Sequence, residues 1–159
     1  MVRLATGDDV ASIASLEAAV LPDPWSEASI EKYLVAPRQA GEPHAEREPR
    51  SVGREAWVAE IDGQTCGYLL ASWTFGEGNI DRVGVEPAWR RRGIARALME
   101  DALAGLARRG VREVWLEVGA SNEPAVRLYE AAGFSIVTRR RRYYPGPPPD
   151  DALIMKRMP

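Results

Sequence analysis

The chain has 159 residues, 45% of them hydrophobic and 28% charged, which is typical of one globular domain with its own core. Its net charge of −2 excludes a basic field over the whole protein that would attract nucleic acid. Its single cysteine excludes an internal disulfide and multi-cysteine zinc sites. There is no signal-peptide core and no run near the roughly 20 apolar residues that span a membrane. We therefore expect a cytoplasmic protein that binds no membrane and no metal.

The first third of the chain predicts a short strand, two helices and a loop. Residues 2–5 can form the strand, and Thr6 can cap the first helix. Apolar residues recur in that helix at helical spacing, namely Val10, Ile13, Leu16 and Val20. Ser26 can cap a second, shorter helix. Residues 36–54 are polar and include three prolines, so we expect a long mobile loop there.

The middle of the chain predicts a β-hairpin and a third strand. Residues 56–61 and 65–74 favour strands, and the Asp-Gly pair at residues 62–63 between them is a hairpin turn signal. Residues 80–85 favour the third strand, which a Glu-Pro pair closes.

The only cysteine and the only histidine lie in segments that do not suggest catalysis. Cys66 falls within the second hairpin strand, where we expect an inert, half-buried thiol rather than a nucleophile. His44 falls in the expected loop, where we expect a solvated side chain.

The second half of the chain alternates helices and strands. A helix that Gly110 can end is predicted by an apolar stripe of Ile94, Leu98, Ala102 and Leu106. Residues 111–118 favour a strand, and a further helix starts near residues 121–124 and stops at Gly133. Two last strands are expected, at residues 134–140 and 152–156, around a proline-rich loop. This order predicts an α/β fold, in which a mixed sheet flanked by helices contains a parallel pair.

The turn before the third helix is the most informative stretch. A strand, a basic turn with glycine and a helix together suit phosphate, because the first N–H groups of a helix lack partners and carry partial positive charge. Glycine allows close approach of backbone, and arginine adds forked hydrogen bonds. The residues are Arg90, Arg91, Arg92, Gly93, Ile94, Ala95 and Arg96. A solvated basic helix start is the alternative, whereas a P-loop is excluded because no Gly-Lys-Ser/Thr follows.

This turn resembles the pyrophosphate-binding motif Gln/Arg-x-x-Gly-x-Gly/Ala of the GNAT superfamily of acetyl-CoA-dependent N-acetyltransferases, with Ala95 in place of the commoner second glycine. Three further segments carry the resemblance, namely residues 83–87, 115–122 and 128–134. The similarity extends from about residue 2 to 155. It implies a GNAT fold in one domain over residues 1–159, with a mostly antiparallel sheet of six to seven strands, a splayed parallel pair and about four helices.

Within the superfamily, the chain most resembles the bacterial ribosomal-protein-alanine N-acetyltransferases. The closer resemblance rests on Pro-Trp-Ser at 24–26, Leu-Glu-Val-Gly-Ala-Ser-Asn at 116–122, Arg-Tyr-Tyr-Pro at 142–145, and residues 151–155. It implies direct transfer of acetyl to the N-terminal α-amine of a protein, an alanine of a ribosomal protein. The loop at residues 36–54 is long for this family, so the resemblance does not define the substrate entrance.

The resemblance also implies roles at the coenzyme site. Backbone groups of Val83, Gly84 and Val85 would pair with the pantetheine arm, and an N–H there can stabilise a developing oxyanion. The basic turn would hold the pyrophosphate, and Asn122 would hydrogen-bond the pantetheine. The plainer alternatives are a core strand for residues 83–85 and a helix cap for Asn122.

By resemblance, Glu117 is the general base and Tyr129 the proton donor to the leaving thiolate. A free glutamate has a pKa of about 4.3, so such a base needs burial or a water relay to take a proton from an amine. A tyrosine pKa of about 10 lies above that of a thiol at about 8.5, so tyrosine can support the thiolate by hydrogen bonding. The alternatives are a solvent-facing strand glutamate and a core tyrosine.

The acceptor amine can be argued from acidity. An α-amino group has a pKa of about 7.7–8.0 against about 10.4 for lysine, so far more of it is neutral near pH 7. By resemblance, Trp25, Tyr143 and Tyr144 line the peptide site, with core packing as the alternative for Trp25.

Two other functions stay open. One is a GNAT enzyme that acts on a small-molecule amine or lysine. The other is a nucleic-acid-binding module that uses the arginines at residues 90–92 and 139–142. The acidic balance argues against nucleic acid, and alternation of residues 139–142 across a strand makes a solvated edge the simpler interpretation.

Overall fold

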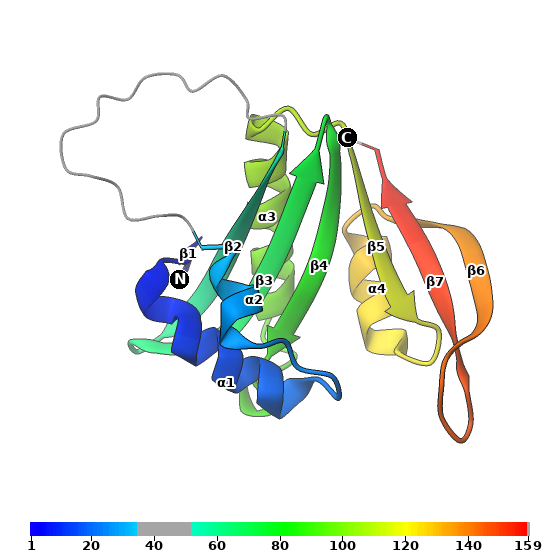
Figure 1. Cartoon of the computed structure of the whole chain (residues 1–159), viewed down its shortest axis with the longest axis horizontal. Helices are drawn as coiled ribbons and strands as arrows, with labels where there is room; N and C mark the ends of the chain where they lie inside the picture. The colour runs from blue at the N-terminus through cyan, green and yellow to red at the C-terminus, as the bar shows by residue number, and fades with distance from the viewer. Residues whose placement is uncertain (35–51, 159) are drawn as a thin grey trace.

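A computed structural model describes residues 1–34 and 52–158. In these residues, seven strands form one sheet in the order β1-β2-β3-β4-β5-β7-β6 (Figure 1). Every neighbouring pair is antiparallel except β4 and β5, which run parallel. The strands are β1 Val2–Leu4, β2 Val52–Ile61, β3 Gln64–Thr74, β4 Glu77–Val85, β5 Glu113–Gly119, β6 Ser135–Tyr144 and β7 Asp150–Arg157. The predicted mixed sheet with one parallel pair is confirmed.

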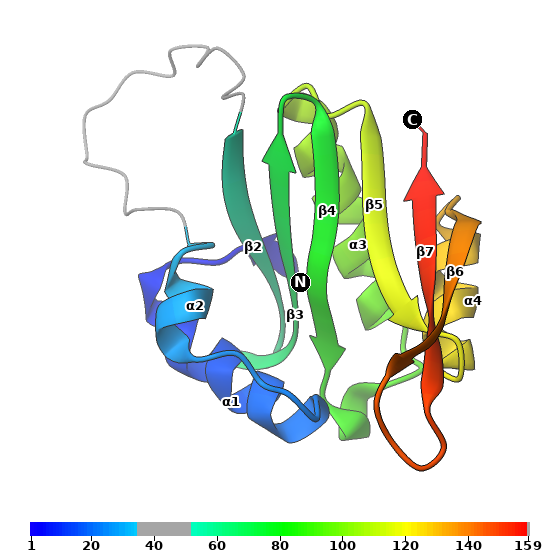
Figure 2. The same cartoon turned by 45° about the vertical axis from the view of Figure 1, so that its right-hand side comes forward.

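Helices cover both faces of this sheet. They are α1 Val10–Val20, α2 Glu27–Glu31, α3 Ile94–Arg108 and α4 Glu123–Ala131, with short 3-10 turns η1 Gly7–Asp9 and η2 Pro87–Trp89. In both views α1 and α2 lie on one face, and α3 and α4 lie on the other (Figures 1 and 2). None of the helices in the described part of the chain combines the length and apolar character needed to cross a membrane.

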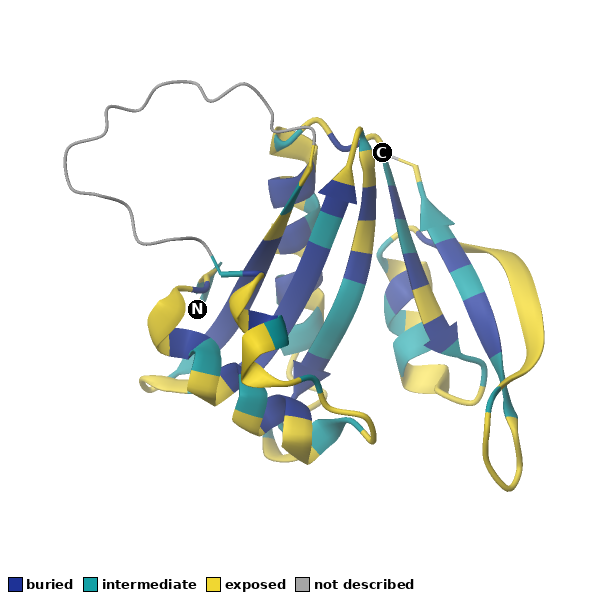
Figure 3. Ribbon diagram, in the orientation of Figure 1, coloured by how far each residue is buried: buried dark blue, intermediate teal, exposed yellow. Residues whose placement is uncertain are grey.

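The central strands supply two separate cores because successive side chains of a strand point to opposite faces. Trp57 and Leu69 belong to a cluster that includes the apolar stripe of α3. Val58 and Tyr68, one position along, belong to a second cluster with residues of α1 and α2. Figure 3 shows the contrast between these buried central strands and the edge strand β6, which is exposed along almost its whole length. The solvated edge expected for the arginines at 139–142 is therefore present.

The hairpin prediction is confirmed, but its first strand starts earlier than expected. Asp62 and Gly63 form the two-residue turn, both with positive φ angles (52° and 77°), as this type of hairpin requires. Residues 52–54 were expected in the loop, and this is wrong. Val52 pairs with Thr74, because the long β3 extends the ladder past the polar local sequence. The rest of the expected loop, with His44, lies outside the described residues.

The thiol of Cys66 is more buried than expected. Its exposed fraction is 0%, and it donates a hydrogen bond to the carbonyl of Ala59 at 3.3 Å. Burial raises the pKa of Cys66, which agrees with an inert side chain.

Strand β4 carries one more residue than the strand it pairs with. Leu70 of β3 pairs with Arg82, and Ala71 pairs with Ile80, so Asp81 has no residue opposite it. This is a β-bulge, which bends a strand and re-aims its side chains.

The bulge coincides with the end of the parallel pairing. Strands β4 and β5 pair only at residues 77–79 and 113–115, just before Asp81. Beyond this point the two strands separate (Figure 1). The second half of β4 therefore keeps β3 along one edge and turns its other edge away from any strand of the described chain.

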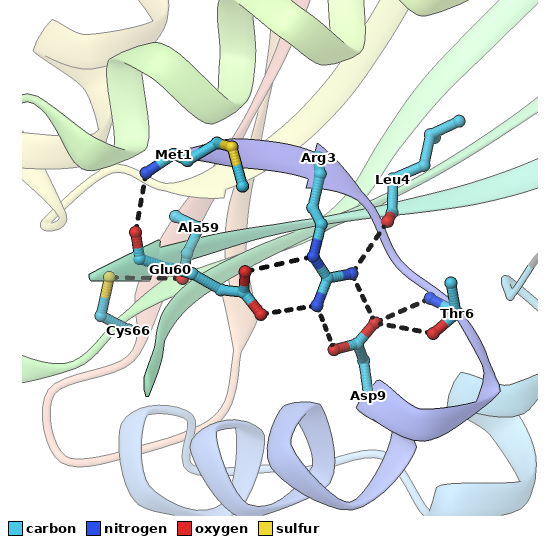
Figure 4. A network of polar contacts seen from close by, with 8 residues as sticks. All are labelled: Met1, Arg3, Leu4, Thr6, Asp9, Ala59, Glu60 and Cys66. Carbon is cyan, nitrogen blue, oxygen red and sulfur yellow. Dashed lines mark hydrogen bonds and ion pairs between the residues drawn. The ribbon is translucent and has the colours of Figure 1, made fainter. Parts of the chain in front are cut away.

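A network around Arg3 ties β1 to η1 and β2 (Figure 4). The guanidinium of Arg3 lies 2.8 Å from the Asp9 carboxylate and 2.6 Å from that of Glu60. Asp9 also accepts a hydrogen bond from the backbone N–H of Thr6 at 2.7 Å. The hydrogen bonds from Arg3 lower the pKa of both carboxylates.

We expect Arg3→Gln to reduce the sensitivity of the fold to acid. A carboxylate whose folded-state pKa is lowered stabilises the fold above its unfolded pKa, and this stabilisation is lost as the pH falls through the folded pKa. The urea midpoint of the wild type should therefore fall between about pH 5 and 3, and that of Arg3→Gln should fall less. Arg127→Gln, which removes an exposed pair with Glu123, is the control. Equal loss in all three proteins would contradict the assignment.

Candidate functional site

A cleft of about 970 Å³ opens where β4 and β5 separate. Its walls come from the end of β4, the turn before α3 with the first residues of that helix, α4, and the end of α1. Most residues predicted from the sequence line it, namely Val83, Gly84, Val85, Arg90, Arg91, Gly93, Ile94, Ala95, Arg96, Asn122 and Tyr129. The tertiary structure thus brings together four predicted segments that are separated in the sequence.

The basic turn has the backbone geometry of an anion site. Gly93 is the N-cap of α3 with φ = 78°, and a Cβ atom there would meet nothing within 4 Å, so conformation rather than crowding requires glycine. No side chain caps α3, so its first N–H groups remain available at a helix end with partial positive charge. Arg90 donates from Nε to the carbonyl of Val85 at 3.0 Å, which ties the turn to β4.

The arginines of the turn do not all face the cleft. Arg92 is absent from the lining, and its guanidinium lies 4.7 Å from the ring centroid of Trp89. Arg96 lines the cleft and also forms an exposed ion pair with Glu100 at 2.8 Å. The turn therefore contributes the positive charges of Arg90, Arg91 and Arg96 to the cleft lining, and α4 adds that of Arg127.

Gly84 is required by packing on the far side of β4. A Cβ atom at this position would lie 2.5 Å from the ring of Tyr68. Tyr68 is fully buried, and its hydroxyl donates a hydrogen bond to the carboxylate of Glu17. Because Gly84 has no side chain, it leaves room for the Tyr68 ring in the second core, and the same residue lines the cleft.

Asn122 and Tyr129 contribute from the two ends of α4. Asn122 is the N-cap, and its side-chain oxygen accepts from the N–H of Ala125 at 3.3 Å, so the expected cap is present while the residue also lines the cleft. Tyr129 is 6% exposed and packs edge-on against Phe134 with ring centroids 6.1 Å apart. Burial raises the pKa of Tyr129 to about 12, so its hydroxyl stays protonated at neutral pH.

Glu117 lies apart from the cleft lining. Its neighbours Leu116 and Val118 point into the first core, so Glu117 points to the face of β5 on which α1 and α2 lie. Its side chain is exposed, and it accepts a hydrogen bond from the hydroxyl of Tyr144 at 2.7 Å. Burial, and then the bond to Glu117, raise the pKa of Tyr144. Glu117 is therefore not buried, and burial was one of the two conditions named above for a glutamate base.

Seven lining residues were not anticipated from the sequence, and four of these belong to α4, namely Pro124, Ala125, Arg127 and Leu128. Val20 and Leu21 reach the cleft from the end of α1, and Trp89 reaches it from η2. No local pattern marks them, because the sheet alone determines which residues lie beside β4. Trp25 packs against the second core, as its alternative predicted.

One buried charged residue could have been recognised from the sequence. Glu17 has an exposed fraction of 0% and lies four residues after Ile13, on the apolar stripe of α1. A glutamate on such a stripe indicates a buried partner, here the hydroxyl of Tyr68.

We expect Gly84→Ala to destabilise the fold by about 1–3 kcal/mol, because the added methyl group must displace the Tyr68 ring. Urea unfolding at neutral pH measures this change. Gly7→Ala is the control, since a Cβ atom at Gly7 meets nothing within 4 Å and should change stability by less than about 0.5 kcal/mol. Equal stability of the two variants would show that Tyr68 does not constrain β4.

Comparison with known proteins agrees with this geometry. The model of the acetyltransferase (GNAT) family matches residues 12–134. The [Ribosomal protein bS18]-alanine N-acetyltransferase of Escherichia coli K12 is 35% identical over 95 residues, which cover 59% of this chain and 64% of the relative. An N-alpha-acetyltransferase of Sulfurisphaera tokodaii is 33% identical over 94 residues, 51% of this chain and 56% of the relative. The match thus spans less than two thirds of each of these two relatives.

Similarity of structure extends further along the chain. The crystal structure of the ribosomal-protein-S18-alanine N-acetyltransferase from Escherichia coli superposes with a TM-score of 0.80 at 27% identity, and the match covers 99% of this chain and 92% of that one. Since the family model also covers most of the chain, including the basic turn and α4, the protein belongs to the acetyltransferase (GNAT) family.

Proposed function

We propose that the protein is an N-acetyltransferase that moves acetyl from acetyl-CoA to the N-terminal α-amine of a protein by direct transfer. The observation that carries this proposal is the cleft in which the uncapped start of α3 lies beside the unpaired edge of β4. The names of the relatives support an N-terminal alanine of a ribosomal protein as acceptor. We expect the enzyme in the cytoplasm, where ribosomal proteins are made.

Different parts of the cleft would bind the pyrophosphate and the pantetheine arm of acetyl-CoA. The first N–H groups of α3, together with Arg90, Arg91 and Arg96, would bind the pyrophosphate. The backbone edge of residues 83–85 would pair with the amide groups of the pantetheine arm, as an added strand would. Asn122 keeps its side-chain NH₂ group as a donor toward the same arm.

The residues at the thioester end divide the chemistry between them. In the proposed reaction the amine nitrogen bonds to the acetyl carbon, and the carbon–sulfur bond breaks. A backbone N–H of residues 83–85 would stabilise the negative charge that develops on the carbonyl oxygen. Tyr129, which burial keeps protonated, would donate a hydrogen bond or its proton to the leaving sulfur. Glu117 would take the proton of the amine through a water molecule.

The acceptor would approach from the face opposite to α3 and α4. Glu117 lies on that face, and Tyr144 is bonded to it. The α1–α2 connection, with Trp25, and the β6–β7 connection, next to Tyr143, lie on either side of the separated strand ends (Figures 1 and 2). An α-amine suits this site better than lysine, because its pKa of about 7.7–8.0 leaves more of it neutral.

A peptide panel tests this function. Purified protein with acetyl-CoA should acetylate short peptides that begin with alanine, and faster than peptides with a blocked N-terminus and a free lysine, or than small-molecule amines. Transfer to free amines alone would favour the other enzyme class. Failure of acetyl-CoA to bind in calorimetry would contradict the proposal as a whole, and a salt-dependent gel shift with DNA or RNA would support the nucleic-acid alternative.

We expect Glu117→Gln to slow turnover by about 100-fold, because the amide cannot accept a proton. The dissociation constant of acetyl-CoA should stay the same, since Glu117 lies outside the cleft lining. Glu113→Gln is the matched control. Glu113 lies on the same strand and face and is bonded to Trp115 and Lys156. Wild-type turnover of Glu117→Gln at every pH would remove Glu117 from the mechanism.

We expect Tyr129→Phe to slow the chemical step by about 10-fold or more, with little change in stability, because the ring still fills its place beside Phe134. Single-turnover rates measure this step. Because the pKa of Tyr129 is about 12, the wild-type rate should not decline between pH 7 and 10 through loss of this donor. A rate for Tyr129→Phe equal to that of the wild type would contradict the donor role.

A further inference from the structure

A buried carboxylate that the proposed chemistry does not use lies beneath the α1–α2 connection. Glu17 of α1 accepts a hydrogen bond from the Tyr68 hydroxyl and another from the backbone N–H of Trp25 at 3.2 Å. Its third contact is an ion pair with Nε of Arg82 at 3.4 Å. A fully buried charge needs such partners, so the position of Glu17 is strongly determined.

Arg82 links this carboxylate to the connection itself. Its guanidinium lies 4.6 Å from the ring centroid of Trp25 and donates to the carbonyl of Asp23 at 3.0 Å. The side chain is only 18% exposed, so solvent screens these contacts weakly. Three residues of α1 and the connection, namely Glu17, Asp23 and Trp25, are therefore attached to one side chain of β4.

The β-bulge explains how a side chain of β4 reaches this place. With Asp81 as the extra residue, Arg82 pairs with Leu70 and points to the face of α1. The next residue, Val83, lines the cleft. Val20 and Leu21, which lead into the connection, line it as well.

We propose that Arg82 is a positioning residue that holds the α1–α2 connection, residues 21–26, as the wall between the coenzyme cleft and the acceptor. This inference rests on the proposed function, since it assigns the wall to acceptor binding. Without Arg82, the connection stays attached to Glu17 through the N–H groups of Leu21 and Trp25, but its exposed middle residues lose their link to β4. The acceptor would then bind to a wall that is not held in place.

If Arg82 only stabilised the fold, its loss would lower the Tm without a specific effect on the peptide KM. The chain contains a matched control for this case. Arg109, in the turn after α3, also forms an ion pair with a buried glutamate, Glu55, and its guanidinium lies 5.7 Å from the ring centroid of Trp73. Arg109 is 34% exposed and does not line the cleft. Loss of either arginine should lower the Tm, but only Arg82 touches the connection.

Steady-state kinetics of Arg82→Gln and Arg109→Gln separate the two roles. For Arg82→Gln we expect the KM of an alanine-terminated peptide to rise about tenfold, with kcat and the dissociation constant of acetyl-CoA within about twofold of the wild type. For Arg109→Gln we expect the wild-type KM despite a lower Tm. A peptide KM that is unchanged in Arg82→Gln, or raised equally in both variants, would overturn the proposal.

Hydrogen exchange tests the same link without turnover. The backbone amides of Leu21 and Trp25, which are both hydrogen-bonded to Glu17, should exchange faster in Arg82→Gln than in the wild type or in Arg109→Gln. If no peptide is acetylated by the wild type, the proposed function fails, while unchanged exchange in Arg82→Gln overturns the role of Arg82 by itself.

A second variant covers the case in which Arg82→Gln does not fold because Glu17 is left as an unpaired buried charge. Glu17→Gln/Arg82→Gln removes both charges and keeps an acceptor oxygen for Tyr68 and the Trp25 N–H. We expect the same rise in peptide KM and the same faster exchange from this double variant. Wild-type values of both would overturn the proposal.

Discussion

The extra residue in β4 is the feature on which the rest of the site depends. With Asp81 unmatched, β4 bends away from β5 after three paired positions, and the backbone of residues 83–85 loses a neighbour on one edge. An unpaired strand edge is costly unless something else satisfies it, and a ligand with amide groups can do so. The cleft is therefore built into the sheet rather than added by a loop.

The bulge also divides the site between the two faces of the sheet. Val83 and Tyr129 belong to the side of α3 and α4, where the cleft lies, whereas Arg82 and Glu117 belong to the side of α1 and α2. In the proposed reaction, the acceptor amine must reach the acetyl group of a coenzyme that is bound in the cleft. The separated strands provide that opening, and groups on either side can differ in burial, as protonated Tyr129 and exposed Glu117 do.

Local patterns in the sequence were reliable where one short segment decides its own conformation. The turn at Gly93 was predictable because a positive φ angle favours glycine, and the Asp-Gly hairpin was predictable for the same reason. Residues 52–54 were not, since Gly53 and Arg54 have little strand preference and are held by the facing residues of β3. Asn122 shows both cases, because its capping role is local and its place in the cleft is not.

By itself, the sequence determined the order of helices and strands, the basic glycine turn before α3 and the membership of the family, because each depends on residue types at fixed short spacings. Only the tertiary structure decided that Glu117 contacts Tyr144 on one face while Tyr129 lines the cleft on the other, and that Arg82 reaches Trp25. The physical reason is that sheet register sets these contacts. A shift of one residue in β4 exchanges the faces of its side chains, and that shift depends on pairing with a strand elsewhere in the chain.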